Sequence, residues 1–185
     1  MKLVVIDPGH GGKDPGAVGN GLQEKDVALS IALKTDWYLN NYYKVNTLVT
    51  RYTDKDLSLQ DRSKISNNKN ADLFFSVHCN AFDGNAYGYE DYTYLTVGQA
   101  TKSIRETFHN KVTEVLNKYN IRNRGMKTKN LAVLRETKAS AILAETLFID
   151  NVSDSNLLKN PSFIEDVARA YADGVASALN LEKKK

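Results

Sequence analysis

The feature that most constrains the fold is the segment 71–79, Ala-Asp-Leu-Phe-Phe-Ser-Val-His-Cys, which is apolar at most positions on both faces. A strand of this kind belongs in a sheet that helices cover on both sides, and such sheets are mostly parallel. Further short strands are predicted at 3–6, 44–50, 87–95, 131–134 and 141–149, with helices between them. The alternation predicts one α/β domain of three layers, with a mixed, mostly parallel sheet of about six strands and helices on both faces.

Apolar residues at spacings of three and four predict helices over 24–41, 59–68, the region 104–119 and the C-terminal part of the chain. Ser58 is predicted to cap the second of these helices, and Ser162 with Glu165 forms a capping-box pattern at the start of the last one. His109 lies beside Phe108 on the third helix and is expected to face solvent.

Composition supports one folded domain and argues against several classes of protein. The 185 residues are 42% hydrophobic and 25% charged, as in ordinary globular domains, and the domain is expected to span residues 1–181. No apolar run is long enough for a membrane helix, and the N-terminus lacks a signal-peptide core. Lys and Arg exceed Asp and Glu by only 25 to 22 and are scattered, which argues against nucleic acid as a partner. Residues 182–185 are interpreted as a basic tail or the start of a linker.

A glycine-rich loop follows the first predicted strand, with six glycines between Pro8 and residue 21. Such a loop lets the backbone bend tightly or approach a ligand closely. The spacing disfavours a phosphate-binding loop, because Asp14 stands where a dinucleotide fingerprint needs glycine and where a Walker loop needs serine or threonine.

Two of the three histidines, His10 and His78, lie at the ends of predicted strands. Ligands bind beyond the carboxyl ends of strands in open α/β sheets, so both imidazoles are expected at one crevice. Glu24 opens the first helix and is the candidate third ligand, although an acid there can also simply complement the helix dipole. Two histidines, one carboxylate and a water form the open shell of a catalytic zinc.

Glu145 interrupts the otherwise uncharged strand 141–149. Burying an ionised carboxylate costs several kcal/mol unless it is paired or lies in a hydrated site. It is therefore either a general base or the partner of Arg135, and beside a His-Glu-His set the base is favoured. Cys79 is expected to face away from His78, because neighbouring residues on a strand alternate, and to be a small buried residue. As the single cysteine it forms no internal disulfide.

Six segments together carry a more specific pattern: VIDPGHGG at 5–12, DPGA at 14–17, EK at 24–25, LVTR at 48–51, ADLFFSVHCNA at 71–81 and LR at 134–135. On these motifs the chain resembles the zinc-dependent N-acetylmuramoyl-L-alanine amidases, the type 3 amidase family. The resemblance extends from residue 2 to about residue 181. It is greatest to cell-wall amidases of spore-forming Bacillus, and looser to phage endolysin catalytic domains.

The resemblance implies that His10, Glu24 and His78 bind zinc and that Glu145 is the catalytic glutamate, in agreement with the residues selected from the pattern. It implies hydrolysis of the amide between the lactyl group of N-acetylmuramic acid and L-alanine in peptidoglycan. Asn80 and Arg135 are expected to bind substrate, with a plain turn residue as the alternative for Asn80. The family commonly has Glu-Leu-Gly-Phe-Ile-Ser-Asn where residues 145–151 read Glu-Thr-Leu-Phe-Ile-Asp-Asn, so leucine at 147 replaces a glycine.

Three other functions stay open on the sequence: another zinc peptidase or deacetylase, a wall-binding module without activity, and a cysteine hydrolase that uses Cys79. We expect a monomer that acts on the cell wall without inserting in membranes. It is released by lysis, is phage-associated, or is the catalytic part of a longer protein with a wall-binding domain after Lys185. Because the connection that follows Cys79 is short, no inserted helix is expected to block the site, and no activating partner is expected.

Overall fold

A six-stranded sheet in the order β4-β1-β5-β8-β6-β7 forms the centre of the structure, a computed structural model in which residues 1–184 are described. Its strands are Leu3–Pro8 (β1), Asn46–Val49 (β4), Leu73–Asn80 (β5), Tyr89–Thr93 (β6), Asn123–Thr128 (β7) and Ser140–Phe148 (β8). Strands β4, β1, β5 and β8 are parallel, whereas β6 pairs antiparallel with β8 and parallel with β7. Val18–Gly19 (β2) and Leu22–Gln23 (β3) form a separate small hairpin.

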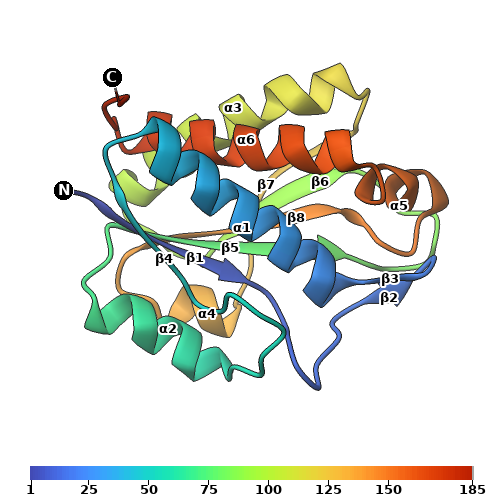
Figure 1. Ribbon diagram of the computed structural model, residues 1–185, viewed down its shortest axis with the longest axis horizontal. Helices are drawn as coiled ribbons and strands as arrows, with labels where there is room; N and C mark the ends of the chain where they lie inside the picture. The colour runs from blue at the N-terminus through green and yellow to red at the C-terminus, as the bar shows by residue number, and fades with distance from the viewer. Residues whose placement is uncertain (185) are drawn as a thin grey trace.

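Helices cover both faces of the sheet (Figure 1). Glu24–Tyr42 (α1), Gln99–Lys118 (α3) and Pro161–Ala178 (α6) pack on one face, and Leu59–Asn68 (α2) with Ala132–Arg135 (α4) packs on the other. Val152–Leu158 (α5) follows β8 and contacts α6. The predicted three-layer α/β domain with a mixed, mostly parallel sheet of six strands is confirmed.

The alternation of side chains along β1 and β5 divides the core in two. Ile6 and Phe75 belong to the larger core, between the sheet and helices α1, α3 and α6. Val5 and Phe74 belong to the smaller core, which also contains residues of α4. Both faces of these strands are therefore buried, as the apolar segment 71–79 predicts. The same alternation sends neighbouring residues near the end of β5 to opposite sides of the sheet.

The segment 131–134 differs from the prediction. It is not a strand but the start of the short helix α4, because an apolar run of four residues does not distinguish a buried strand from a buried helical turn. The sixth strand is β7 at the edge of the sheet. Its side chains are partly or largely exposed and mostly polar, so no hydrophobic pattern marks it.

The last helix also begins differently from its prediction. Asn160 is the N-cap and accepts a hydrogen bond from the backbone N–H of Ser162 at 2.9 Å, with Pro161 as the first helical residue. Glu165 accepts instead from Lys34 and from the hydroxyl of Tyr38, so it ties α6 to α1. The predicted cap of α2 is confirmed, since the side chain of Ser58 accepts from the backbone N–H of Asp61.

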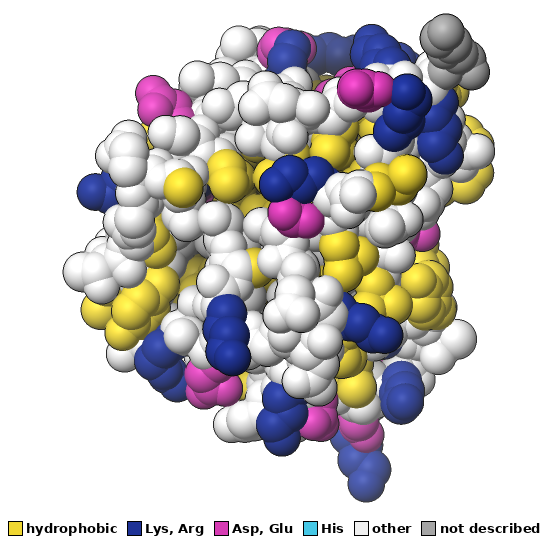
Figure 2. All heavy atoms as spheres, turned by 90° about the vertical axis from the view of Figure 1, so that its left-hand side faces the viewer, with side chains coloured by type: hydrophobic (Ala, Val, Ile, Leu, Met, Phe, Trp, Pro, Cys, Tyr) yellow, Lys and Arg dark blue, Asp and Glu magenta, His cyan; other side chains and the backbone are white. Residues whose placement is uncertain are grey.

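Figure 2 shows the end of the molecule where the parallel strands begin. Basic side chains gather near the C-terminus there and are otherwise interspersed with acidic and apolar ones, and no histidine is visible on this face. None of the helices in the described part of the chain has the length and apolar character needed to cross a membrane. The histidine-bearing strand ends, and with them the candidate site, lie at the opposite end of the sheet.

Candidate active site

The three side chains predicted as metal ligands meet at the carboxyl ends of β1 and β5. Glu24 Oε1 lies 3.1 Å from His10 Nε2 and 2.9 Å from His78 Nδ1. One ligand atom from each residue lies within 4.8 Å of the others. Zinc bonds of about 2.1 Å to nitrogen and oxygen place tetrahedral ligand atoms about 3.4 Å apart. The spacing of this cluster therefore suits a zinc ion without a change of fold.

Glycine is needed where the loop approaches these side chains. A Cβ atom on Gly9 would lie 2.3 Å from Cε1 of His78. On Gly16, which has a φ of +66°, it would lie 2.6 Å from both Glu24 Oε2 and His10 Cδ2. The glycine-rich loop thus wraps the His-Glu-His cluster itself, which explains why it lacks the spacing of a phosphate loop.

Two buried arginines hold the same loop. Arg62 donates to the carbonyl oxygens of Pro8 and His10, each at 2.6 Å, and Arg51 donates to that of Gly9 at 2.8 Å. His10 has a φ of +59°, a left-handed conformation that persists in a residue other than glycine only where its surroundings determine it. Sequence reasoning gave neither arginine a role, because each acts through contacts with a distant segment.

The cluster stabilises negative charge on Glu24 and positive charge on the neighbouring imidazoles. Burial alone would raise the pKa of Glu24, but the hydrogen bonds from His10 and His78 outweigh it and hold that pKa well below its usual value. Burial would lower the pKa of His10, yet the contacts with Glu24 and Asp14 raise it to about 9. Asp14 Oδ2 lies 2.7 Å from Nδ1 of His10 and so directs Nε2 toward the cluster, as the outer partner of a metal-binding histidine does.

Glu145 lies beside this cluster without belonging to it. It is in register with His78 across β5 and β8, so the two side chains share one face of the sheet. Its Oε2 atom is enclosed and has no hydrogen-bond partner among the described residues. Burial raises the pKa of Glu145 to about 7, against the opposing charge of His78. An unpaired carboxyl with a pKa near neutrality can take up and release a proton, as a general base must.

The structure contradicts the alternative in which Glu145 pairs with Arg135. Arg135 is exposed at the end of α4 and donates to Asn130 Oδ1 at 2.5 Å and to Glu136 Oε1 at 3.2 Å. Since 131–134 is helical, Arg135 does not end a strand of the sheet. The predicted contact of Arg135 with substrate stays a prediction.

Asn80 ends β5 on the same side as His78, and its amide is held from two directions. Its Nδ2 donates to Glu90 Oε1 at 2.7 Å, and its Oδ1 accepts from the backbone N–H of Ala81 at 3.0 Å. Glu90, which is buried on β6, is a site residue that was not predicted from the sequence. The available signal was an acid inside the predicted strand 87–95, the same signal that marks Glu145.

The side chains of Cys79 and His109 do not join the cluster, although the backbone N–H of Cys79 donates to Glu24 Oε1 at 3.0 Å. Cys79 is buried in the larger core, as predicted, and burial raises the pKa of its thiol well above the usual value, which disfavours a nucleophile. The predicted exposure of His109 is wrong: it is buried, with Nδ1 2.5 Å from Asp91 Oδ2. His109 precedes Val112 and Leu116 by three and seven positions, which places it at the edge of the apolar stripe of α3.

Leu147, at the position where the family commonly has glycine, keeps the backbone conformation that favours glycine. Its φ is +66°, and its side chain is fully buried in the larger core. The leucine therefore fills the core under α1, α3 and α6 and does not line the open face of the site.

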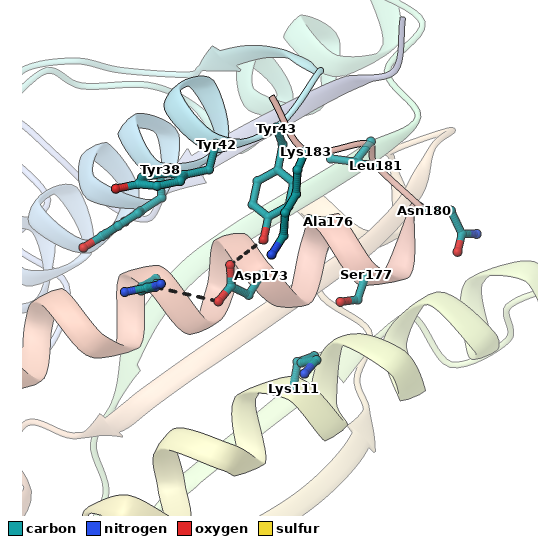
Figure 3. Close-up of a pocket in the computed structure, with 11 residues that line it drawn as sticks. Tyr38, Tyr42, Tyr43, Lys111, Asp173, Ala176, Ser177, Asn180, Leu181 and Lys183 are labelled. Carbon is teal, nitrogen blue, oxygen red and sulfur yellow. Dashed lines mark hydrogen bonds and ion pairs between the residues drawn. The ribbon is translucent and has the colours of Figure 1, made fainter. Parts of the chain in front are cut away.

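A cavity of about 550 Å³ lies apart from this site, between the end of α1 and helices α3 and α6 (Figure 3). Two tyrosine hydroxyls in its lining are already engaged: that of Tyr43 donates to Asp173, and that of Tyr38 donates to Glu165. It contains none of the three ligands, and its chemistry is that of a surface groove between packed helices.

Comparisons with known proteins agree with the geometry. The family profile for N-acetylmuramoyl-L-alanine amidase matches residues 4–177. The sporulation-specific N-acetylmuramoyl-L-alanine amidase of Bacillus subtilis (strain 168) is 47% identical over 184 residues, 99% of this chain and 70% of that protein. The endolysin of Bacillus phage SPP1 is 44% identical over 185 residues, 99% of this chain and 68% of that protein.

A solved structure extends the comparison to three dimensions. The catalytic domain of the amidase CwlV from Bacillus (Paenibacillus) polymyxa matches with a TM-score of 0.92 at 33% identity, over 98% of this chain and 100% of that domain. The fold and the sequence thus agree, and the chain belongs to the N-acetylmuramoyl-L-alanine amidase family.

Proposed function

We propose that this amidase cleaves the bond between the lactyl group of N-acetylmuramic acid and L-alanine with a zinc ion bound by His10, Glu24 and His78 and with Glu145 as the general base. Amidase activity on peptidoglycan follows from the family. The observation that carries the zinc and the base is the convergence of three ligand atoms beside an unpaired carboxylate oxygen of Glu145.

The donor set fits zinc in its chemistry as well as its spacing. Two imidazole nitrogens and one carboxylate oxygen are typical ligands of catalytic zinc, and three protein ligands leave the fourth position for water or substrate. Zinc bound in such a shell supplies a Lewis acid and lowers the pKa of a water from 15.7 to about 7. The local charge agrees, because the ionised Glu24 favours positive charge at this point, where zinc would take the place of the protons on the imidazoles.

Residues of the chain carry out proton transfer and substrate binding. Glu145 accepts a proton from the attacking water and passes it to the leaving amino group of L-alanine. Asn80, at the end of β5, donates a hydrogen bond to the substrate near the scissile amide. Arg135, exposed at the end of α4, contacts the substrate farther from that bond.

Digestion of purified peptidoglycan tests the proposal. Protein loaded with one zinc per chain should release new L-alanine amino termini without new reducing sugar ends. Removal of the metal should stop the reaction, and one equivalent of zinc should restore it. New reducing ends would point to a glycosidase, and full turnover by metal-free protein would refute the zinc. The variant Cys79→Ser should retain activity, and its loss would favour a cysteine hydrolase.

The proposal includes a monomer that acts at the cell wall without an activating partner. Residues 81–88, which connect β5 to β6 beside the site, contain no helix. Similarity to the SPP1 endolysin supports release during lysis. Purified protein with zinc should therefore digest the wall at once, and a large stimulation of turnover by a second protein would contradict this part.

A further inference from the structure

Three side chains lie in one row across the middle of the sheet. The strand register pairs His78 on β5 with Glu145 on β8, and Glu145 with Glu90 on β6. Side chains of directly paired residues lie on the same face and close together. Glu90 is thus the neighbour of Glu145 on the side away from the metal ligands, next to the reacting groups but outside the ligand cluster.

The hydrogen-bonding capacity of Glu90 is used within the protein. Its Oε1 accepts from Asn80 Nδ2 at 2.7 Å and from the hydroxyl of Tyr92 at 2.6 Å. Its Oε2 accepts from Arg124 Nε at 2.7 Å and from Lys127 Nζ. Glu90 is only 2% exposed, and although burial would raise its pKa, these donors lower it to about 2. An ionised carboxylate with four donors is not available as a second base or a further ligand.

Glu90 decides which way the amide of Asn80 points. The two orientations of an asparagine amide differ by a 180° flip, and the hydrogen bonds around it determine which one is correct. In the observed orientation Nδ2 faces Glu90 and Oδ1 faces the N–H of Ala81. The flipped orientation would set the amide oxygen against a buried carboxylate and the amide nitrogen against a backbone N–H, and both hydrogen bonds would be lost.

The amide nitrogen of Asn80 has one donor to spare. An asparagine side chain carries two N–H groups on that nitrogen. Glu90 accepts one of them, and the described residues offer no acceptor for the other. Asn80 as a whole is only partly buried, so part of this residue is open to solvent or to a ligand in the site.

We propose that Glu90 is a positioning residue that fixes Asn80 as a hydrogen-bond donor to the substrate beside Glu145. The inference rests on the proposed function and extends it. The free N–H of Asn80 binds an oxygen of the muramoyl-peptide near the scissile amide. Glu90 is buried and does not touch the substrate; it keeps the amide oxygen of Asn80 from taking the place of the donor.

The variant Glu90→Gln tests this role. A glutamine has one acceptor oxygen and an NH₂ group, so it cannot hold all four donors or dictate the orientation of Asn80. We expect kcat/KM on peptidoglycan to fall about 10- to 100-fold, similar to the loss when a residue that orients a metal ligand is removed, with zinc content unchanged. The matched control is Glu165→Gln on α6, which also removes a carboxylate that accepts from a lysine and a tyrosine; it should leave kcat/KM unchanged.

A double-mutant cycle separates positioning from general support of the fold. In an Asn80→Ala background, Glu90→Gln should change kcat/KM less than about twofold, because the donor that it positions is gone. Equal losses in both backgrounds would show a merely structural role and overturn the inference. Glu90→Asp, which keeps the charge, provides a second variant should the glutamine variant not fold, and it should recover part of the activity.

The proposed function and the role of Glu90 fail in different ways. Wild-type protein that releases no L-alanine amino termini would refute the proposed function. Wild-type protein that releases them, alongside a Glu90→Gln variant with full kcat/KM, would refute only the role of Glu90.

Discussion

Two buried carboxylates in this structure each meet an imidazole, yet only one of the contacts belongs to the candidate active site. Glu24 lies within 3.1 Å of both His10 and His78, whose side chains are 24% and 17% exposed. Asp91 lies 2.5 Å from His109 between β6 and α3, where the two side chains are 0% and 6% exposed. Pairing alone does not distinguish the two places; the accessibility of the imidazoles does.

The two acid–imidazole contacts also differ in how many of the surrounding polar atoms already have a hydrogen-bond partner. Both ring nitrogens of His109 are occupied, one by Asp91 and the other by Asn123 at 3.0 Å. At the strand ends a second imidazole converges on the same carboxylate oxygen, and Glu145 lies beside it with an oxygen that no described residue binds. A buried acid–imidazole pair is thus ordinary packing, whereas convergence of several donors at an accessible point indicates chemistry.

The largest effect is expected from the ligands themselves. The variants His78→Ala and Glu24→Gln should lose bound zinc and should lower amidase activity to the background of the assay, because two remaining ligands do not hold a catalytic zinc. Metal analysis and release of L-alanine amino termini measure the two losses. If His78→Ala kept one zinc per chain and normal turnover, the proposed difference between the Glu24 contacts and the Asp91 contact would be wrong.

Removal of the general base should reduce the activity strongly but should leave the metal in place. Glu145→Gln should lower the rate by about 100- to 10,000-fold, the usual contribution of a positioned acid–base group, with one zinc retained per chain. Rates and metal content of the same preparation provide the measurement. If the variant lost its zinc, Glu145 would have to be regarded as a ligand and not as the base.

Zinc should stabilise the fold through the contacts of Glu24 and not through the Asp91–His109 pair, so its removal should lower the stability of the wild-type protein. Zinc at 100 times its dissociation constant should stabilise the wild-type fold by about 2.7 kcal/mol. For a domain of this size that corresponds to a rise in Tm of about 5–10 °C. Calorimetry with zinc and with a chelator measures the shift. Glu24→Gln should show no shift, and an equal shift in that variant would place the metal elsewhere.

The smallest effect is expected at His109. The variant His109→Ala leaves Oδ2 of the buried Asp91 with only the hydroxyl of Tyr89, at 3.2 Å, as a partner among the described residues and should destabilise the fold by about 1–3 kcal/mol. Zinc content and activity should not change below the melting temperature. Urea unfolding gives the first quantity, and the amidase assay gives the second. A folded variant without activity would show that this contact, too, serves the reaction.

The central part of the fold could be predicted from the sequence because its patterns are local. The two-sided apolar run of β5, the periodicity of α1 and the cap at Ser58 each indicate their element directly. The prediction failed for β7 and α4, an exposed edge strand and a helix of one turn. Neither has a hydrophobic period long enough to be recognised.

Some residues of the candidate site could likewise be predicted from the sequence, and others could not. His10, Glu24 and His78 could be selected because the ends of a strand and the start of a helix show in the sequence. The roles of Arg51 and Glu90 could not, because they depend on hydrogen bonds to other elements of the fold, that of Arg51 to the loop after β1 and that of Glu90 to the end of β5. The candidate ligands could be recognised from their positions along the chain, whereas the residues that position the loop and Asn80 are recognised only from their contacts in the structure.

The leucine at position 147 has a consequence for how such a chain can evolve. A left-handed backbone costs a residue with a side chain about 1–2 kcal/mol, while truncating a buried leucine to alanine costs about 2–5 kcal/mol. Alanine at this position would keep the strain and lose the packing, and glycine would relieve the strain but leave a void. Leucine and glycine are therefore two separate optima. Glycine at 147 would suit a core in which a neighbouring side chain is larger and fills the void, so the acceptable residue at 147 depends on the core around it.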